Sequence, residues 1–173
     1  MLRIGELLAL RWSDIIEKDG KNFIYVHSQK LTNYTVNDDM SISPRDYKTV
    51  NHTKNRKDEG FRFQPLSDKA NEVLAKAKML NPSGEFIFMI DGKQLSCPTF
   101  NEHLKRCCIA LNIPYYSSHI IRFTAASILC ATGVPLNYIQ RLLGHTTLAM
   151  TIHYLRSVSD EDSMADIMCN ALN

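Results

Sequence analysis

The sequence predicts one α+β domain that is mainly α-helical and carries a small three-stranded antiparallel sheet. Three observations support this class. The length of 173 residues is near the ~150 residues of one domain. The hydrophobic fraction of 45% and the charged fraction of 22% are those of a globular protein. Strand-like segments precede residue 67, and helical patterns follow it.

The strands are expected in the first third of the chain. Residues 2–10 predict an opening helix, because leucines recur and Glu6 sits early. A polar stretch over residues 32–46, with Asn37-Asp38-Asp39, predicts a loop or a long hairpin connection. The predicted strands of the sheet are 22–31, 47–53 and 61–66. The charged turn 54–60 joins the last two.

The rest of the chain predicts helices. Ser67 is a good cap residue, Pro135 fits a first helical turn, and Gly144 allows a left-handed helix ending. Ser159 is placed to cap a last, acidic helix. The predicted helices are 67–80, 96–111, 118–131, 135–144, 147–156 and a final segment from 159.

Charge and cysteine content narrow the function classes. Residues 1–157 carry a net charge of +6, whereas residues 158–173 carry −4. A basic body with an acidic tail suits a polyanion such as nucleic acid, although ordinary scatter also explains a charge of this size. The five cysteines form no CxxC pair, which predicts reduced thiols in a cytoplasmic protein. We find no leader and no run long enough for a membrane span, so we expect no membrane partner.

One helix carries polar residues that look out of place. Apolar residues surround the 118–131 segment almost completely, which predicts a buried helix. His119 and Arg122 nevertheless share one of its faces. A buried arginine needs a partner, and residues 115–159 contain no acid. Either a distant carboxylate (Glu6 or Asp14) or an anion from outside must meet Arg122.

The next segment adds His145 at a helix junction and Tyr154 nine residues later. Backbone amides after such a junction can face an anion. By themselves, a Gly-His pair and a later tyrosine do not indicate a functional site. They favour the interpretation that Tyr154 is a tyrosine of the hydrophobic core.

Together these residues resemble the catalytic domain of the tyrosine recombinases, the phage-integrase family. The first family box is visible as LRIGELLALRWSD over residues 2–14. The second runs from HIIR at 119–122 through LLGH at 142–145 to Tyr154. The resemblance covers essentially the whole chain, and its HxxR, LGH and Tyr string is specific.

The resemblance implies the tyrosine recombinase catalytic-domain fold over residues 1–173. We expect this domain to be truncated at its N-terminus and the family's separate core-binding domain to be absent from the chain. Two departures stand out. Phe123 occupies a position where the family often has a second histidine, and residues 32–48 form a long polar insertion.

The resemblance also implies a chemistry, in which DNA strands are cleaved and rejoined through a 3′-phosphotyrosyl intermediate. Guanidinium groups suit phosphate oxygens because their planar fork binds two at once. A phenol, with a pKa near 10, needs a base. The implied roles are phosphate binding for Arg3 and Arg122, nucleophile for Tyr154, base for His119, phosphate hydrogen bond for His145 and general acid for Lys54.

Some assignments have rivals. Lys48 and Lys57 compete with Lys54, which fits the strand-to-turn position better. Glu6, one helical turn from Arg3, is expected to orient that arginine. His27, His52 and His103 have no ligand spacing, so we expect no metal and no cofactor.

The expected function is a site-specific recombinase or integrase of a mobile element, with double-stranded DNA as partner. Other protomers on the DNA are further expected partners. The tail places an apolar stripe on an acidic helix, which would contact a neighbouring protomer or its own domain: Met164, Ile167, Met168, Ala171 and Leu172. Two alternatives stay open, a non-catalytic DNA-binding remnant and an enzyme that relaxes supercoils like a type IB topoisomerase.

Overall fold

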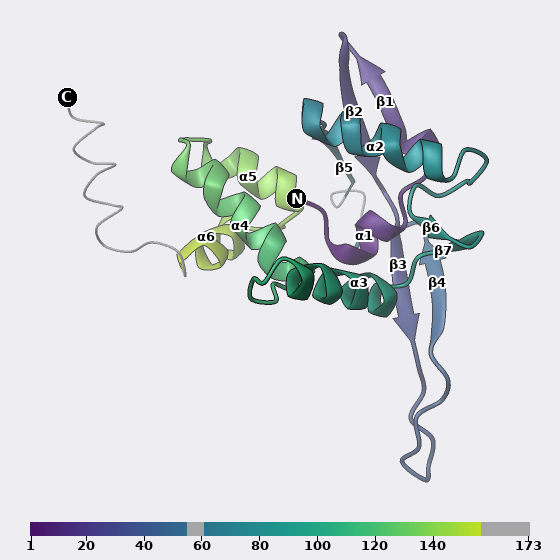
Figure 1. Ribbon diagram of the computed structural model, residues 1–173. Coiled ribbons are helices and arrows are strands. Elements are labelled where there is room, and N and C mark those ends of the chain that lie inside the picture. The colour runs from purple at the N-terminus through teal and green to yellow at the C-terminus, as the bar shows by residue number, and fades with distance from the viewer. Residues whose placement is uncertain (55–60, 157–173) are drawn as a thin grey trace, which may run out of the picture.

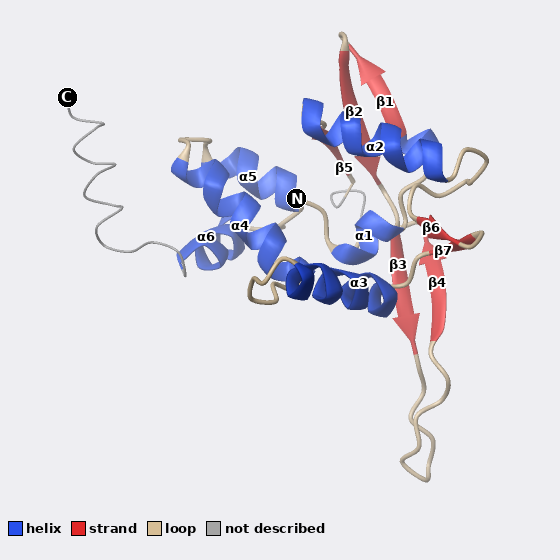
Figure 2. Ribbon diagram, viewed as in Figure 1, coloured by secondary structure: helices blue, strands red, loops and turns tan. Residues whose placement is uncertain are grey.

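The computed structural model describes residues 1–54 and 61–156 and confirms the mainly helical α+β class. Figure 1 shows the strands together on one side, helices α4, α5 and α6 on the other, and α1 between them. Figure 2 shows the same division by element type. The elements are α1 (Ile4–Leu8), η1 (Trp12–Asp14), β1 (Ile15–Lys18), β2 (Lys21–Val26), β3 (Gln29–Asn33), β4 (Asp46–Val50), β5 (Arg62–Pro65), α2 (Asp68–Leu80), β6 (Met89–Ile90), β7 (Lys93–Gln94), α3 (Cys97–Ala110), α4 (Ser118–Ala131), α5 (Leu136–Leu143) and α6 (Leu148–Arg156).

The predicted single sheet is wrong in its composition. The described strands form a three-stranded sheet in the order β1-β2-β5 and two separate hairpins, β3-β4 and β6-β7. All pairs are antiparallel, with Tyr25 opposite Phe63 in one sheet and Leu31 opposite Lys48 in another. The segment expected as one strand over 22–31 is therefore two strands that belong to different sheets.

Two features accompany these differences, one a contact between segments and one a local turn. The chain leaves β2 at His27, whose Nε2 lies 2.9 Å from Asp14 Oδ1, and only then enters β3. The unpredicted β1 pairs with β2 across Asp19-Gly20, where both residues have positive φ (52° and 70°). This is the mirror-image turn that closes two-residue hairpins, and Asp-Gly is its usual sequence.

The long connection over residues 32–46 is a hairpin extension. β3 pairs with β4 as far as Asn33 and Asp46, and an isolated bridge joins Val36 to Ile42 beyond them. Figure 1 shows this extension projecting away from the helices. It confirms the expected long hairpin connection.

The helix predictions agree closely with the observed bounds, because serine caps mark the starts. Ser67, Ser96 and Ser117 each accept a hydrogen bond from the backbone N–H three residues on. The first helix is shorter than the expected 2–10, since α1 covers only Ile4–Leu8. The helix expected from residue 159 lies outside the described residues.

The expectation that helix 118–131 is buried all round is wrong. In α4 only Arg122 and Ala126 are buried, whereas Ile120 is 42% exposed and Ile128 is 58% exposed. α4 packs against α5 and α6, so its remaining faces stay open.

Two apolar clusters form the interior. One surrounds Leu10, Ile24, Val26 and Ile87 and joins α1 to the sheet. The other surrounds Ala126, Ile139 and Leu143 and joins α4 to α5. Glu6 on α1 and Arg62 on β5 are buried and connect the two, because Arg62 bonds both Glu6 and the backbone of Leu142. The charged contacts at this junction position the candidate site.

Candidate active site

The structure brings all six predicted site residues to one cavity of about 320 Å³. Ile4, Ser118 and Met150 complete its lining. Of the rival lysines, Lys48 is absent from the described lining, and Lys57 lies outside the described residues. The predicted residues at the cavity are Arg3, Lys54, His119, Arg122, His145 and Tyr154.

These side chains come from five segments. Arg3 immediately precedes α1, and Lys54 follows β4 in a turn. His119 and Arg122 lie on α4, one turn apart. His145 stands at the junction of α5 and α6, and Tyr154 lies on α6. Only the tertiary fold brings these segments together.

Arg122 has partners within the protein, which answers the question left open by the sequence. Its Nη1 and Nη2 donate hydrogen bonds to the carbonyl oxygens of Met1 and Leu143, both at 2.5 Å. Its Nη1 also lies 3.9 Å from Glu6 Oε2. The distant carboxylate is thus Glu6; Asp14 contacts His27 instead. Burial, followed by the charge of Arg3, lowers the pKa of Arg122 to about 10.

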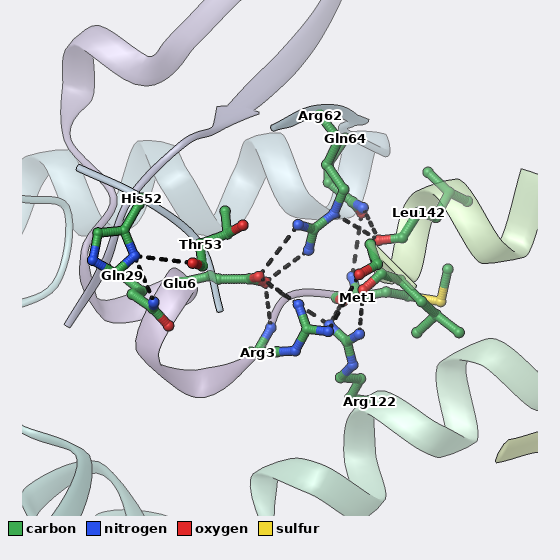
Figure 3. Close-up of polar contacts among 12 residues, drawn as sticks. Met1, Arg3, Glu6, Gln29, His52, Thr53, Arg62, Gln64, Arg122 and Leu142 are labelled. Atoms are coloured by element: carbon green, nitrogen blue, oxygen red, sulfur yellow. Dashed lines mark hydrogen bonds and ion pairs between the residues drawn. The ribbon is translucent and has the colours of Figure 1, made fainter. Parts of the chain in front are cut away.

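Glu6 is the shared acceptor for the arginines (Figure 3). Arg62 Nη2 donates to Glu6 Oε2 at 2.7 Å, and Arg3 Nη1 donates to Oε1 at 2.9 Å. The latter contact confirms the expected pairing of Arg3 with Glu6. Burial would raise the pKa of Glu6, but the hydrogen bonds and charges of Arg62 and Arg3 outweigh it and hold that pKa below its usual value. Three guanidinium groups around one carboxylate leave positive charge for an incoming anion.

Arg62 is the residue of this cluster that sequence reasoning missed. It is 9% exposed and lies 56 residues from Glu6 in the chain. Its strand offered one signal, because β5 buries the polar Arg62 and Gln64 while Phe63 is 56% exposed. Polar residues on the inward face of a strand must meet polar partners.

His145 is held in place by its junction. Gly144 ends α5 in the left-handed conformation (φ 62°, ψ 43°), as expected from the sequence. His145 Nδ1 lies 3.1 Å from the hydroxyl of the buried Thr151. Burial and, after it, the charges of three arginines lower the pKa of His145 to about 4. The imidazole is therefore neutral near pH 7. In the tautomer in which Nδ1 accepts the Thr151 hydroxyl proton, the ring proton of His145 is on Nε2.

Tyr154 packs against three aromatic rings. The rings of His119, Phe123 and His145 lie edge-on to it, with centroids 5.0–5.5 Å away. Phe123, the departure from the family pattern, thus packs directly on the tyrosine. Burial raises the pKa of the Tyr154 hydroxyl, although the charge of Arg122 opposes this. The phenol is protonated at neutral pH and requires a proton acceptor to react.

Lys54 is exposed and follows the fully buried Thr53. His52 Nδ1 lies 3.0 Å from the carbonyl oxygen of Thr53. The turn thus begins at a buried residue, and Lys54, the next residue, lines the cavity.

Residues 1–54 and 61–156 hold no group of three or more His, Cys, Asp or Glu side chains that could ligate a metal ion. None of the helices in these ranges is long and apolar enough to cross a membrane.

Comparison with known proteins defines the class. The model of the phage integrase family matches residues 1–161, and the chain therefore belongs to this family. A tyrosine recombinase XerC-like protein of Caldanaerobacter subterraneus subsp. tengcongensis is 26% identical over 166 residues, covering 87% of this chain and 41% of that protein. A tyrosine recombinase of Thermosipho africanus is 33% identical over 134 residues, covering 77% and 45%. The chain spans less than half the length of these relatives.

Solved structures share the fold. The Tn1549 transposon integrase, in complex with circular intermediate DNA, superposes with a TM-score of 0.74 at 21% identity, over 98% of this chain and 56% of that one. The XerA recombinase superposes with a TM-score of 0.69 at 18% identity, over 98% and 51%. The fold predicted from the family resemblance is thereby confirmed.

Proposed function

We propose that residues 1–173 form the catalytic domain of a site-specific DNA recombinase or integrase that works through a 3′-phosphotyrosyl intermediate. One observation carries the proposal: a tyrosine, two arginines, a lysine and two histidines from five segments converge on one cavity. Such a set supplies a nucleophile, positive charge and proton carriers for phosphoryl transfer.

The proposed first step breaks one DNA strand. The Tyr154 oxygen attacks the phosphorus and forms a P–O bond, while the bond from phosphorus to the 5′-oxygen breaks. His119 accepts the phenolic proton, and Lys54 gives a proton to the leaving 5′-oxygen. Rejoining reverses the sequence with a 5′-hydroxyl of another strand, which releases the tyrosine.

The arginines and His145 are proposed to stabilise charge. Arg3 and Arg122 bind non-bridging oxygens of the phosphate, and neutral His145 donates from Nε2. Because Arg122 already bonds two carbonyl oxygens, its position is set before the DNA arrives. This preorganisation is the main source of catalysis in sites of this kind.

The partners and setting belong to the same proposal. Double-stranded DNA of a mobile element is the substrate, and further protomers assemble on it, with the tail over residues 159–173 contacting a neighbour. The Tn1549 integrase, which is bound to DNA in its structure, supports this assignment by its similar fold. The unpaired state of Cys97, Cys107, Cys108 and Cys130 supports a reducing, cytoplasmic setting.

Nicked duplexes test the function. The substrate is a pool of random-sequence duplexes, each carrying one nick. When a strand is cleaved a few nucleotides before its nick, the short fragment between the two breaks diffuses away, and the covalent adduct accumulates. We expect the wild-type chain to form an adduct that EDTA does not reduce. Adduct formation without strand exchange, accompanied by supercoil relaxation, would favour the topoisomerase alternative. DNA binding with no adduct would favour the non-catalytic remnant.

A further inference from the structure

Arg62 joins parts of the chain that are distant in sequence. It opens β5, and its Nη1 and Nη2 donate to the two carboxylate oxygens of Glu6 at 3.2 and 2.7 Å. Its Nε donates to the carbonyl oxygen of Leu142 at 3.0 Å. One planar guanidinium therefore bonds α1 and the last turn of α5 at the same time, as Figure 3 shows.

The contact with Glu6 extends to Arg3. Glu6 accepts bonds from both the Nη1 and the backbone N–H of Arg3, at 2.9 and 2.8 Å. The orientation of the Glu6 carboxylate thus fixes the side chain of Arg3 at the cavity. Arg62 holds that carboxylate in its fork.

The second contact extends to the α5–α6 junction. Leu142 lies two residues before Gly144, and Gln64 on the same strand also donates to the Leu142 carbonyl oxygen. Arg62 packs closely on the junction itself, since a Cβ added to Gly144 would lie 2.8 Å from its Nη1. Arg3 Nη2 donates to the Gly144 carbonyl oxygen at 3.3 Å. His145, which lines the cavity, directly follows Gly144 in this junction.

Arg62 itself stands behind the cavity. Together with Gly144 and His145 it lines a neighbouring pocket. It is not among the described residues that line the cavity holding Tyr154. Its charge still reaches the site, because it contributes to the lowered pKa values of Arg122 and His145.

We infer that Arg62 is a positioning residue for the DNA-cleaving reaction: its fork holds Arg3, through Glu6, and the Gly144–His145 junction in one fixed arrangement. This inference rests on the proposed function. A misplacement of about 1 Å at such groups can cost a reaction about 100-fold.

The test separates the hydrogen-bonding geometry of the Arg62 guanidinium from its positive charge. Arg62→Lys keeps the charge, but one ammonium cannot bond Glu6 and Leu142 as the guanidinium does. We expect this variant to fold, to bind nicked DNA as the wild type does, and to keep the NMR titration of His145 near the wild-type position. We expect its adduct-forming rate to fall about tenfold or more.

Arg62→Gln removes the charge as well. We expect a further loss of rate and an upward shift of the His145 titration. Arg141→Gln is the matched control, because it removes one positive charge from an exposed side chain of α5, and it should leave that titration in place.

Three results would overturn the inference. The first is a wild-type adduct rate in folded Arg62→Lys. The second is a loss confined to DNA affinity, which would place Arg62 on the DNA. The third is failure of both variants to fold, which would make Arg62 a stability residue only. If the wild type forms no adduct, the proposed function fails instead, and the His145 titrations in the free protein still report on Arg62.

Discussion

The hydroxyl of Tyr154 donates a hydrogen bond to the backbone carbonyl oxygen of His119, at 3.4 Å. The acceptor is thus the main chain of His119, while the two rings meet edge-on. A carbonyl oxygen cannot take up the phenolic proton at neutral pH. For His119 to act as the base, the phenol must leave this carbonyl and turn toward the imidazole when the phosphate binds.

Exchange of Lys54 for alanine tests the proposed general acid. We expect Lys54→Ala to slow cleavage about 100-fold or more, because the leaving 5′-oxygen loses its proton donor. A substrate with sulfur in place of that oxygen should restore the rate, since a thiolate leaves without a proton. Lys48→Ala is the control and should react normally with both substrates. Failure of the sulfur substrate to restore the rate would remove Lys54 from this role.

His145 makes stability depend on pH. Its pKa is about 4 when folded and 6.5 in its ordinary state, so between these values the unfolded chain binds more protons. The stabilisation is complete above about pH 6.5 and is lost as the pH falls toward 4. The urea midpoint of the wild type should decrease between pH 6.5 and pH 4, and we expect this decrease to be smaller in His145→Gln. In His153→Gln, at an exposed position of α6, the decrease should be as large as in the wild type. Equal slopes for all three proteins would refute the assignment.

Glu6 balances three arginines, so its loss should be costly. We expect Glu6→Gln to lower the free energy of unfolding by about 3–5 kcal/mol, because buried guanidinium groups lose their shared counter-charge. Urea unfolding measures this effect. Glu17→Gln, at an exposed position of β1, is the matched control and should change little. A loss below about 1 kcal/mol would show that solvent reaches the cluster.

Arg122 should matter more for the reaction than for stability. Burial and, after it, the charge of Arg3 lower its pKa, so an apolar replacement of similar length removes a desolvated charge as well as hydrogen bonds. We expect Arg122→Met to stay within about 1 kcal/mol of the wild type in unfolding free energy. Its cleavage rate should fall about 100-fold or more. A loss of about 3 kcal/mol or more in stability would assign Arg122 a mainly structural part.

Several helix ends were predicted from local signals in the sequence. The Ser67 cap and the Gly144 helix ending depend on neighbouring residues and mark helix ends, whereas the six cavity residues follow from the family resemblance. The Asp19-Gly20 turn is an equally local signal for β1, which was not predicted.

What could not be predicted depends on contacts between distant segments. Whether a strand over 22–31 continues or divides depends on Asp14 and His27 meeting in space. The burial of Arg62 depends on Glu6 and Leu142, which lie 56 and 80 residues away. The same holds for α4, whose apolar sequence predicts a covered helix although α5 and α6 leave several of its isoleucines exposed.

The central claim is that Tyr154 becomes linked to the 3′-phosphate of cleaved DNA. Nuclease and protease digestion of the trapped adduct, followed by mass spectrometry, identifies the linked residue directly. We expect a nucleotide joined through its 3′-phosphate to Tyr154, no adduct with Tyr154→Phe, and a normal adduct with Tyr138→Phe, at an exposed tyrosine of α5. Linkage to another residue, linkage through a 5′-phosphate, or an adduct that survives in Tyr154→Phe would contradict the claim.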